Sequence, residues 1–110
     1  MMANEILNPV SSASLDVRAI PASATSKLIL SASEHRAGAV FYNHSPASLY
    51  LRYSQNMDYS ASVDLFTVKL ASGSYFEMLN PVYRGQVHGI WDDADGVVMV
   101  TNLDVMDPYR

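Results

Sequence analysis

Alternation between apolar and polar residues is the pattern that most restricts how this chain can fold. In FTVKL, residues 66–70, apolar side chains occupy every second position, and LYLRY, residues 49–53, repeats the pattern. A period of two is that of a β-strand with one face buried, whereas a helix needs apolar residues three and four positions apart. Outside SASEHRAG, residues 31–38, where Ser33 would cap at most one helical turn, the sequence has no helical stripe. The chain is therefore predicted to fold as strands.

The apolar runs are short and evenly spaced. About eight of them follow one another at intervals of roughly 8–12 residues, bounded by Gly, Pro, Asn, Asp or Ser. This spacing is typical of all-β sandwiches and barrels. We predict a single antiparallel β-sandwich or flattened barrel of about eight short strands. Its core is expected to include Leu49, Leu51, Phe66, Val68, Leu70, Val98 and Val100.

The length of 110 residues corresponds to one domain. Residues 1–14 are polar, small and interrupted by Pro9, so they are predicted to form an extended N-terminal arm, and residues 15–110 the β-sandwich domain. The arm still carries three apolar side chains that a partner would bury: Ile6, Leu7 and Val10. The C-terminal DVMDPYR is interpreted as a frayed end or as a docking tail that presents Tyr109.

Composition excludes several classes of protein. The net charge is −4 and the seven basic residues are scattered, which argues against a nucleic-acid partner. The absence of cysteine excludes disulfides and thiolate metal sites. We see no signal peptide and no apolar stretch long enough for a membrane span, so we expect a soluble protein made in a cytoplasm. The charged fraction of 16% is low and leaves neutral surface suited to protein contacts.

An aspartate cluster, DDADG, follows the only tryptophan, Trp91. Asp93 and Asp95 belong to a D-x-D-G fragment of a calcium loop, but an apolar strand follows where the remaining ligands should be. Asp and Gly also suit tight turns, because both tolerate left-handed backbone and Asp caps its own backbone. We predict a hairpin turn here, with a weak cation site as the alternative.

Signatures of catalysis or metal binding are lacking. His35, His44 and His88 have no second ligand at metal-binding spacing, and the sequence has no nucleophile elbow, no zinc-protease motif and no phosphate-binding glycine loop. We therefore expect a protein that is not an enzyme and uses no cofactor or metal.

The seven tyrosines are many for this length, and tyrosine is enriched at protein interfaces. They also pack well between neighbouring strands, so a mixture of both roles is expected. Tyr50 alternates out of phase with Leu49 and Leu51, which makes it the best single candidate for a contact residue. The predicted partner-binding residues are thus Ile6, Leu7, Val10, Tyr50 and Tyr109.

Three stretches, VFYNHSPASLYLRY, FTVKLASGSYFEML and YRGQVHGIWDDADGVVMVTNL, resemble a group of small structural proteins of tailed bacteriophages. The resemblance covers residues 39–103, and Met78 and Leu79 depart from it, since that group has Val-Pro there. The matching positions are Tyr42, Asn43, Ser45, Leu49, Tyr50, Leu51, Val68, Leu70, Gly73, Tyr75, Glu77, Tyr83, Gly85, Gly89, Ile90, Trp91, Val100, Thr101 and Leu103.

The resemblance implies a β-sandwich component of the virion, made in the host cytoplasm, with structural roles for Gly73, Gly85 and Gly89 and no catalytic residues. Our first hypothesis is a capsid decoration (cement) protein that assembles with copies of itself, as a trimer, and braces the major capsid protein. The alternatives are a tail, baseplate or fibre-attachment module, or a carbohydrate-binding module at the host surface. Exposure of Trp91 would favour carbohydrate binding, and its burial would count against it.

Overall fold

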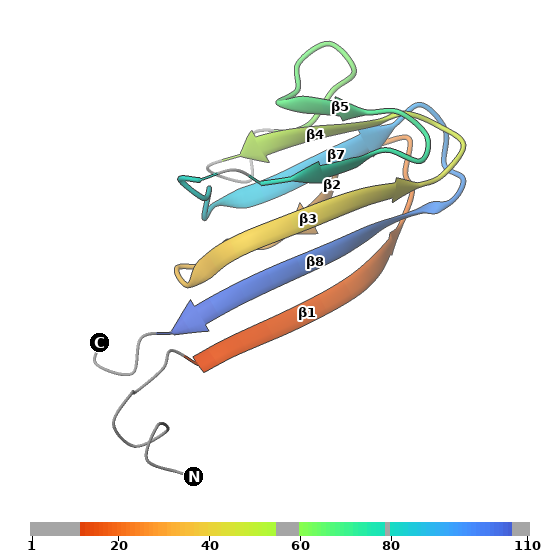
Figure 1. The fold of residues 1–110 in the computed structure, drawn as a ribbon. Coiled ribbons are helices and arrows are strands. Elements are labelled where there is room, and N and C mark those ends of the chain that lie inside the picture. Colours follow the sequence, from red (N-terminus) through yellow and green to blue (C-terminus); the bar gives the residue numbers. More distant parts are fainter. Residues whose placement is uncertain (1–11, 55–59, 79, 107–110) are drawn as a thin grey trace, which may run out of the picture.

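Eight strands make up the computed structural model, which describes residues 12–54, 60–78 and 80–106 (Figure 1). Those residues contain no helix, and hence none that could cross a membrane. The all-β prediction with about eight strands is confirmed. The strands are β1 (Ser12–Pro21), β2 (Lys27–Leu30), β3 (Arg36–His44), β4 (Leu49–Ser54), β5 (Val68–Leu70), β6 (Tyr75–Glu77), β7 (Gln86–Trp91) and β8 (Val97–Met106).

The strands form two antiparallel sheets of four strands each, stacked as two layers (Figure 1). Sheet A has the order β1-β8-β3-β6, and sheet B has the order β2-β7-β4-β5. The pairs β1–β8, β2–β7, β3–β6 and β4–β5 show that the chain folds back on itself from its middle outward. This nesting of strand pairs across two sheets is the order of a double-sheet jelly roll.

The core lies between the two sheets and is built from their inward-facing apolar residues. Five of the predicted core residues are buried, namely Leu49, Leu51, Leu70, Val98 and Val100. Val68 is half-buried against them. The prediction for Phe66 is wrong: its side chain is 39% exposed, because the residue precedes β5 and lies on the outer side of sheet B. Further core side chains come from Ile29, Phe41, Val87 and Trp91.

The aspartate-rich turn at residues 92–96 joins the two sheets. Strand β7 before it pairs with β2 and β4, whereas β8 after it pairs with β1 and β3, so the predicted hairpin is wrong although the turn itself is present. Gly96 has a φ of +93°, and a Cβ there would lie 2.5 Å from the Cβ of Ser45. The close approach of the turn at Ser45 thus requires glycine at this position.

The start of β1 moves the predicted boundary of the arm. Residues 12–14 already pair with β8, so the strand begins at Ser12 and the arm predicted for residues 1–14 would end before it. Ile6, Leu7 and Val10 lie outside the described residues, and so does Tyr109. The docking roles of these four residues remain predictions.

Candidate interaction face

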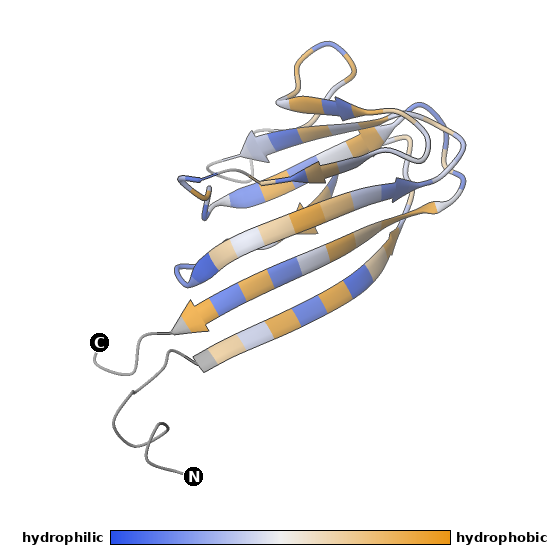
Figure 2. Ribbon diagram, viewed as in Figure 1, coloured by the Kyte–Doolittle hydropathy of each residue, from blue (hydrophilic) through white to orange (hydrophobic). Residues whose placement is uncertain are grey.

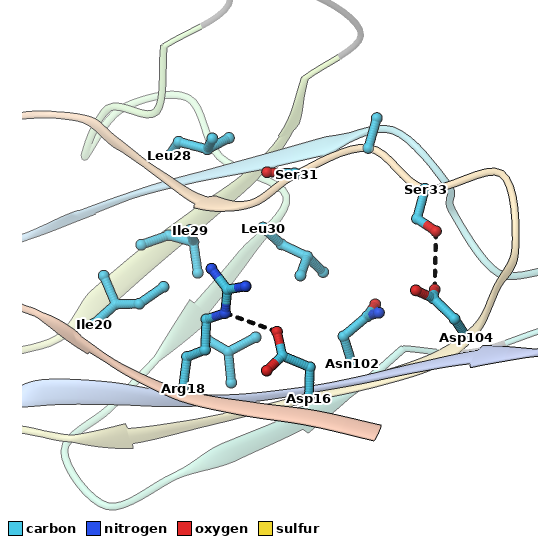
Figure 3. A pocket seen from close by; sticks show the side chains of 12 residues that line it. Asp16, Arg18, Ile20, Leu28, Ile29, Leu30, Ser31, Ser33, Asn102 and Asp104 are labelled. Atoms are coloured by element: carbon cyan, nitrogen blue, oxygen red, sulfur yellow. Dashed lines mark hydrogen bonds and ion pairs between the residues drawn. The ribbon is translucent and has the colours of Figure 1, made fainter. Parts of the chain in front are cut away.

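Strand β1 turns its apolar side chains outward. Leu15 is 69% exposed and Val17 is 59% exposed on the outer side of sheet A. Asp16 and Arg18, which alternate with them, line the groove between the sheets and form an ion pair of 2.7 Å (Figure 3). Apolar and charged side chains thus alternate along residues 15–18, but Leu15 and Val17 face away from the core.

Neighbouring strands extend this apolar surface across sheet A. The register places Val17 beside Thr101 and Thr101 beside Val40, while the next row runs from Ala19 through Met99 and Tyr42 to Tyr75. Figure 2 shows the alternating hydropathy along β1 and β8 that produces these rows. We call this surface the sheet A outer face. It is formed by Leu15, Val17, Ala19, Val40, Tyr42, Tyr75, Met99, Thr101 and Leu103, together with the exposed Glu77 beside Val40.

A shallow hollow of about 330 Å³ lies on the sheet A outer face. Leu15, Val40, Leu103 and the charged Glu77 line it, and Gly38 leaves its floor open because no side chain projects there. Leu15, Val17, Tyr42, Tyr75 and Met99 are the exposed large apolar side chains of the face. Contiguous exposed apolar surfaces are typical of sites that contact another protein, a membrane or a ligand, which makes this face the candidate interaction face.

The outer side of sheet B is covered by the chain itself around Tyr50. Tyr50 points outward there, as the alternation predicted, but it is only 8% exposed. The ring of Phe66 packs edge-on against the Tyr50 ring with centroids 5.2 Å apart. Lys69 Nζ lies 5.5 Å from the centroid of the Tyr50 ring, and the Tyr50 hydroxyl lies 3.4 Å from Asp92 Oδ2. Tyr50 is thus an internal packing residue, with little area left for the partner contact predicted from its outward phase.

The segment 60–67 provides this cover through backbone anchors. The Ala61 N–H donates to Ser26 Oγ (2.9 Å), and the Ser60 carbonyl accepts from Arg52 Nη1 (2.9 Å). At its other end the Thr67 N–H donates to the Leu51 carbonyl (2.7 Å). These bonds hold the segment across sheet B, which explains why Phe66 remains over Tyr50.

Asn43 is the centre of a buried hydrogen-bond network. Its fully buried side chain donates from Nδ2 to the carbonyls of Ala47 (2.8 Å) and Leu70 (2.9 Å). Its Oδ1 accepts from Ser45 Oγ (2.8 Å) and from Trp91 Nε1 (3.3 Å). The asparagine, serine and tryptophan of the quoted stretches therefore form one buried network that ties the two sheets together.

The glycines singled out in those stretches have structural roles, as predicted. Gly73 adopts a φ of +78° in the turn before β6. A Cβ on Gly89 would lie 2.9 Å from Ile29 Cγ1, and one on Gly85 would overlap the Tyr83 ring. Side chains at the last two positions would collide with packed neighbours.

Arg36 closes one end of the groove between the sheets. Its guanidinium is fully buried and donates to Asn102 Oδ1 (2.8 Å), to the Tyr83 carbonyl (2.7 Å) and to the Ser31 carbonyl. Burial lowers the pKa of Arg36, while the charge of Asp104 opposes that shift. Arginine keeps its charge at neutral pH, so this network is a structural clamp.

The groove itself contains polar side chains that already bond to one another. Ser33 Oγ donates to Asp104 Oδ1 (2.9 Å), and Arg18 pairs with Asp16 (Figure 3). Apolar side chains of β2, including Ile29 and Leu30, form the opposite wall. These polar groups bond to one another within the chain, so the groove is interpreted as part of the contact between the two sheets.

Titratable side chains of the described residues form no cluster of three or more that could hold a metal ion. In the turn at residues 92–96, Asp93 Oδ1 accepts from the Ala94 N–H (2.8 Å), which is the local capping role expected of a turn aspartate.

Burial lowers the pKa of His88, whose Nδ1 is buried without a hydrogen-bond partner.

Trp91 is 1% exposed and belongs to the core. Its indole N–H is directed to Asn43, so its ring offers no surface for stacking against a sugar. Burial of Trp91 therefore counts against a carbohydrate-binding module. Comparisons of the sequence with protein-family models and with curated proteins, and of the fold with solved structures, find no match.

Proposed function

We propose that this chain is a structural protein of a tailed-bacteriophage virion, namely a capsid decoration protein that binds the major capsid protein through the sheet A outer face. The observation that carries the proposal is the exposure of Leu15, Val17 and Tyr75 on that face, whereas Tyr50 on the outer side of sheet B lies under Phe66. Exposure of apolar surface to water raises the free energy of the chain, and burial of that surface against a permanent protein partner lowers it.

The jelly-roll order supports the same class. Double-sheet jelly rolls recur in viral capsid proteins and in lectins, so the fold alone leaves both functions open. Burial of Trp91 argues against the lectin-like function, and the sequence resemblance favours the virion. The fold and the exposed face together favour structural assembly.

The chemistry of the face also fits a protein partner. The side chains that form it include no lysine or arginine, which a nucleic acid or an anionic surface would require. Tyrosine and methionine, both present on it, are enriched in the cores of protein interfaces. The proposed partners are thus the major capsid protein and other copies of the chain.

A particle reconstruction tests this function. We expect the chain at positions that follow the symmetry of the shell, with Val17, Tyr42 and Met99 buried against capsid subunits. A few copies confined to the tail would support the tail, baseplate or fibre-attachment alternative instead. Solvent-exposed positions for these three side chains in the assembled particle would overturn the proposed docking face.

A further inference from the structure

Strand β1 forms a long open edge of sheet A. It has 10 residues, whereas the other three edge strands, β2, β5 and β6, have 4, 3 and 3. Residues 13–19 of β1 are all exposed. A long exposed edge strand presents unpaired backbone groups that another strand can bind.

The hydrogen bonds to β8 identify the backbone groups that remain open. The Ala22 N–H donates to the Gly96 carbonyl (2.9 Å), one step beyond the pairing of Pro21 with Val97. Bonded positions alternate along an antiparallel pair, so the even-numbered residues of β1 bond to β8. The odd-numbered residues point their N–H and C=O groups toward the open edge, and these are Ala13, Leu15, Val17 and Ala19.

We infer that this edge pairs with the same edge of a second copy of the chain, antiparallel and about a twofold axis at Val17. Asp16 of each copy then lies opposite Arg18 of the other. An axis at Asp16 would instead set two aspartates opposite each other, and an axis at Arg18 would set two arginines opposite each other. Opposite charges favour a cross-strand pair and like charges disfavour it. Charge complementarity therefore selects the register centred on Val17.

The same register satisfies the open backbone groups. Val17 lies opposite Val17 of the second copy, and Leu15 lies opposite Ala19, so odd-numbered residues meet odd-numbered residues as hydrogen-bonded pairs. Their side chains all lie on the outer side of the sheet, where Leu15 and Val17 are the most exposed. Association thus brings together the apolar side chains that β1 leaves in water.

The resulting dimer joins two copies of sheet A into one continuous eight-stranded sheet. A twofold axis perpendicular to the sheet keeps both outer faces on the same side, so the dimer presents a doubled docking surface. Two linked faces bind a repetitive shell more tightly than one. The twofold pairing closes at two copies, in contrast to the trimer expected from the sequence.

This inference rests on the proposed function only in that the proposed function already includes other copies of the chain as partners. It is tested on the isolated full-length chain, without a capsid. Failure of the dimer therefore leaves capsid binding untouched, and failure of capsid binding leaves the dimer untouched.

Cysteine cross-linking tests the register directly, because the chain contains no native cysteine. In Val17→Cys the two Cα atoms would lie about 5.5 Å apart, within the range of a disulfide, and a mild oxidant should give a covalent dimer. The matched control is Ala19→Cys, on the same side of the same strand. Its counterpart in the second copy would lie about 13 Å away along the strands, too far to cross-link.

Charge exchange tests the selection of the register in sedimentation equilibrium. The wild-type chain should show twice the 12.1 kDa of one copy at concentrations across the micromolar range. Asp16→Arg and Arg18→Asp should each be monomeric alone, because each sets like charges opposite each other. Their mixture should form a dimer, since each variant then faces its complement. Glu34→Arg, in an exposed turn, makes the same change in charge as Asp16→Arg and should leave the dimer intact.

Four outcomes would overturn the inference. They are a monomeric or trimeric wild-type chain, equal cross-linking of the two cysteine variants, charge variants that dimerise alone, and a mixture of charge variants that stays monomeric. Circular dichroism of each variant shows whether it retains the strand-rich fold, and the cysteine variants test the register without changing any charge.

Discussion

The outer sides of the two sheets are built alike but end up in different environments. Each carries outward-facing tyrosine, namely Tyr50 on sheet B and Tyr42 and Tyr75 on sheet A. On sheet B, Phe66 folds over Tyr50, whereas Tyr75 on sheet A is 67% exposed. An aromatic residue that faces out of a sheet is therefore available for contact with a partner only when no segment of its own chain covers it.

A charge placed on the sheet A outer face should have the largest effect. We expect Met99→Lys to reduce attachment to particles by more than about tenfold, since burying an unpaired ammonium at the contact costs more than about 1.4 kcal/mol. Its melting temperature should stay close to that of the wild type, because Met99 is exposed in the free chain. Particle occupancy after washing is the measurement.

The matched control is Leu65→Lys, which places the same charge on the segment over sheet B. Leu65 is 59% exposed, so its side chain is free to accept the change. We expect full attachment for this variant. Equal losses for both variants would show that the two outer sides do not differ in function.

Removal of the cover from sheet B should affect stability instead of attachment. Phe66→Ala loses the edge-on contact with Tyr50 and part of its apolar burial, together about 1–2 kcal/mol. For a chain of this length the melting temperature should fall by roughly 5–10 °C. Tyr75→Ala, on the uncovered face, should change the free energy of unfolding by less than about 0.5 kcal/mol. A larger loss from Tyr75→Ala would mean that sheet A also depends on its outer aromatic residues.

Deleting residues 1–11 tests whether the sheet A outer face acts alone. The deletion stops before Ser12, because β1 begins there. We expect an unchanged melting temperature and a several-fold loss of occupancy, since burial of Ile6, Leu7 and Val10 on a partner would be partly offset by the cost of ordering the arm. Equal occupancy for the full-length and truncated chains would remove the arm from the docking surface.

The smallest expected effect concerns pH. Burial lowers the pKa of His88 below its usual value, so the unfolded chain binds the proton more readily than the folded chain does. The corresponding stability is fully present above about pH 6.5 and is lost as the pH falls toward the lowered pKa. His88→Gln should flatten the decline in melting temperature between about pH 7.5 and about pH 5.5. An unchanged decline would assign the pH dependence to other groups.

The strand content of this protein follows from its sequence by itself. Alternation at residues 49–53 and 66–70 predicted strands, and the burial of Leu49, Leu51 and Leu70 confirms which side of them faces the core. The turn at residues 92–96 was also predictable, because aspartate and glycine adopt the backbone conformations that a turn needs. These are local properties, and local chemistry is sufficient to specify them.

The sheet to which each strand belongs was decided only in the tertiary structure. The turn after Trp91 has the sequence of a hairpin, yet it crosses between sheets because β8 finds its partners in β1 and β3. The side of β1 that faces out was equally hidden. Its alternation would place apolar Leu15 and Val17 against the core, yet the tertiary structure leaves both in solvent and places the charged Asp16 and Arg18 in the groove. Tyr50 and Phe66 reversed their expected roles because segment 60–67 folds across sheet B. The choice of strand partners and the covering of a sheet face depend on residues far apart in the chain, and a local sequence pattern does not predict them.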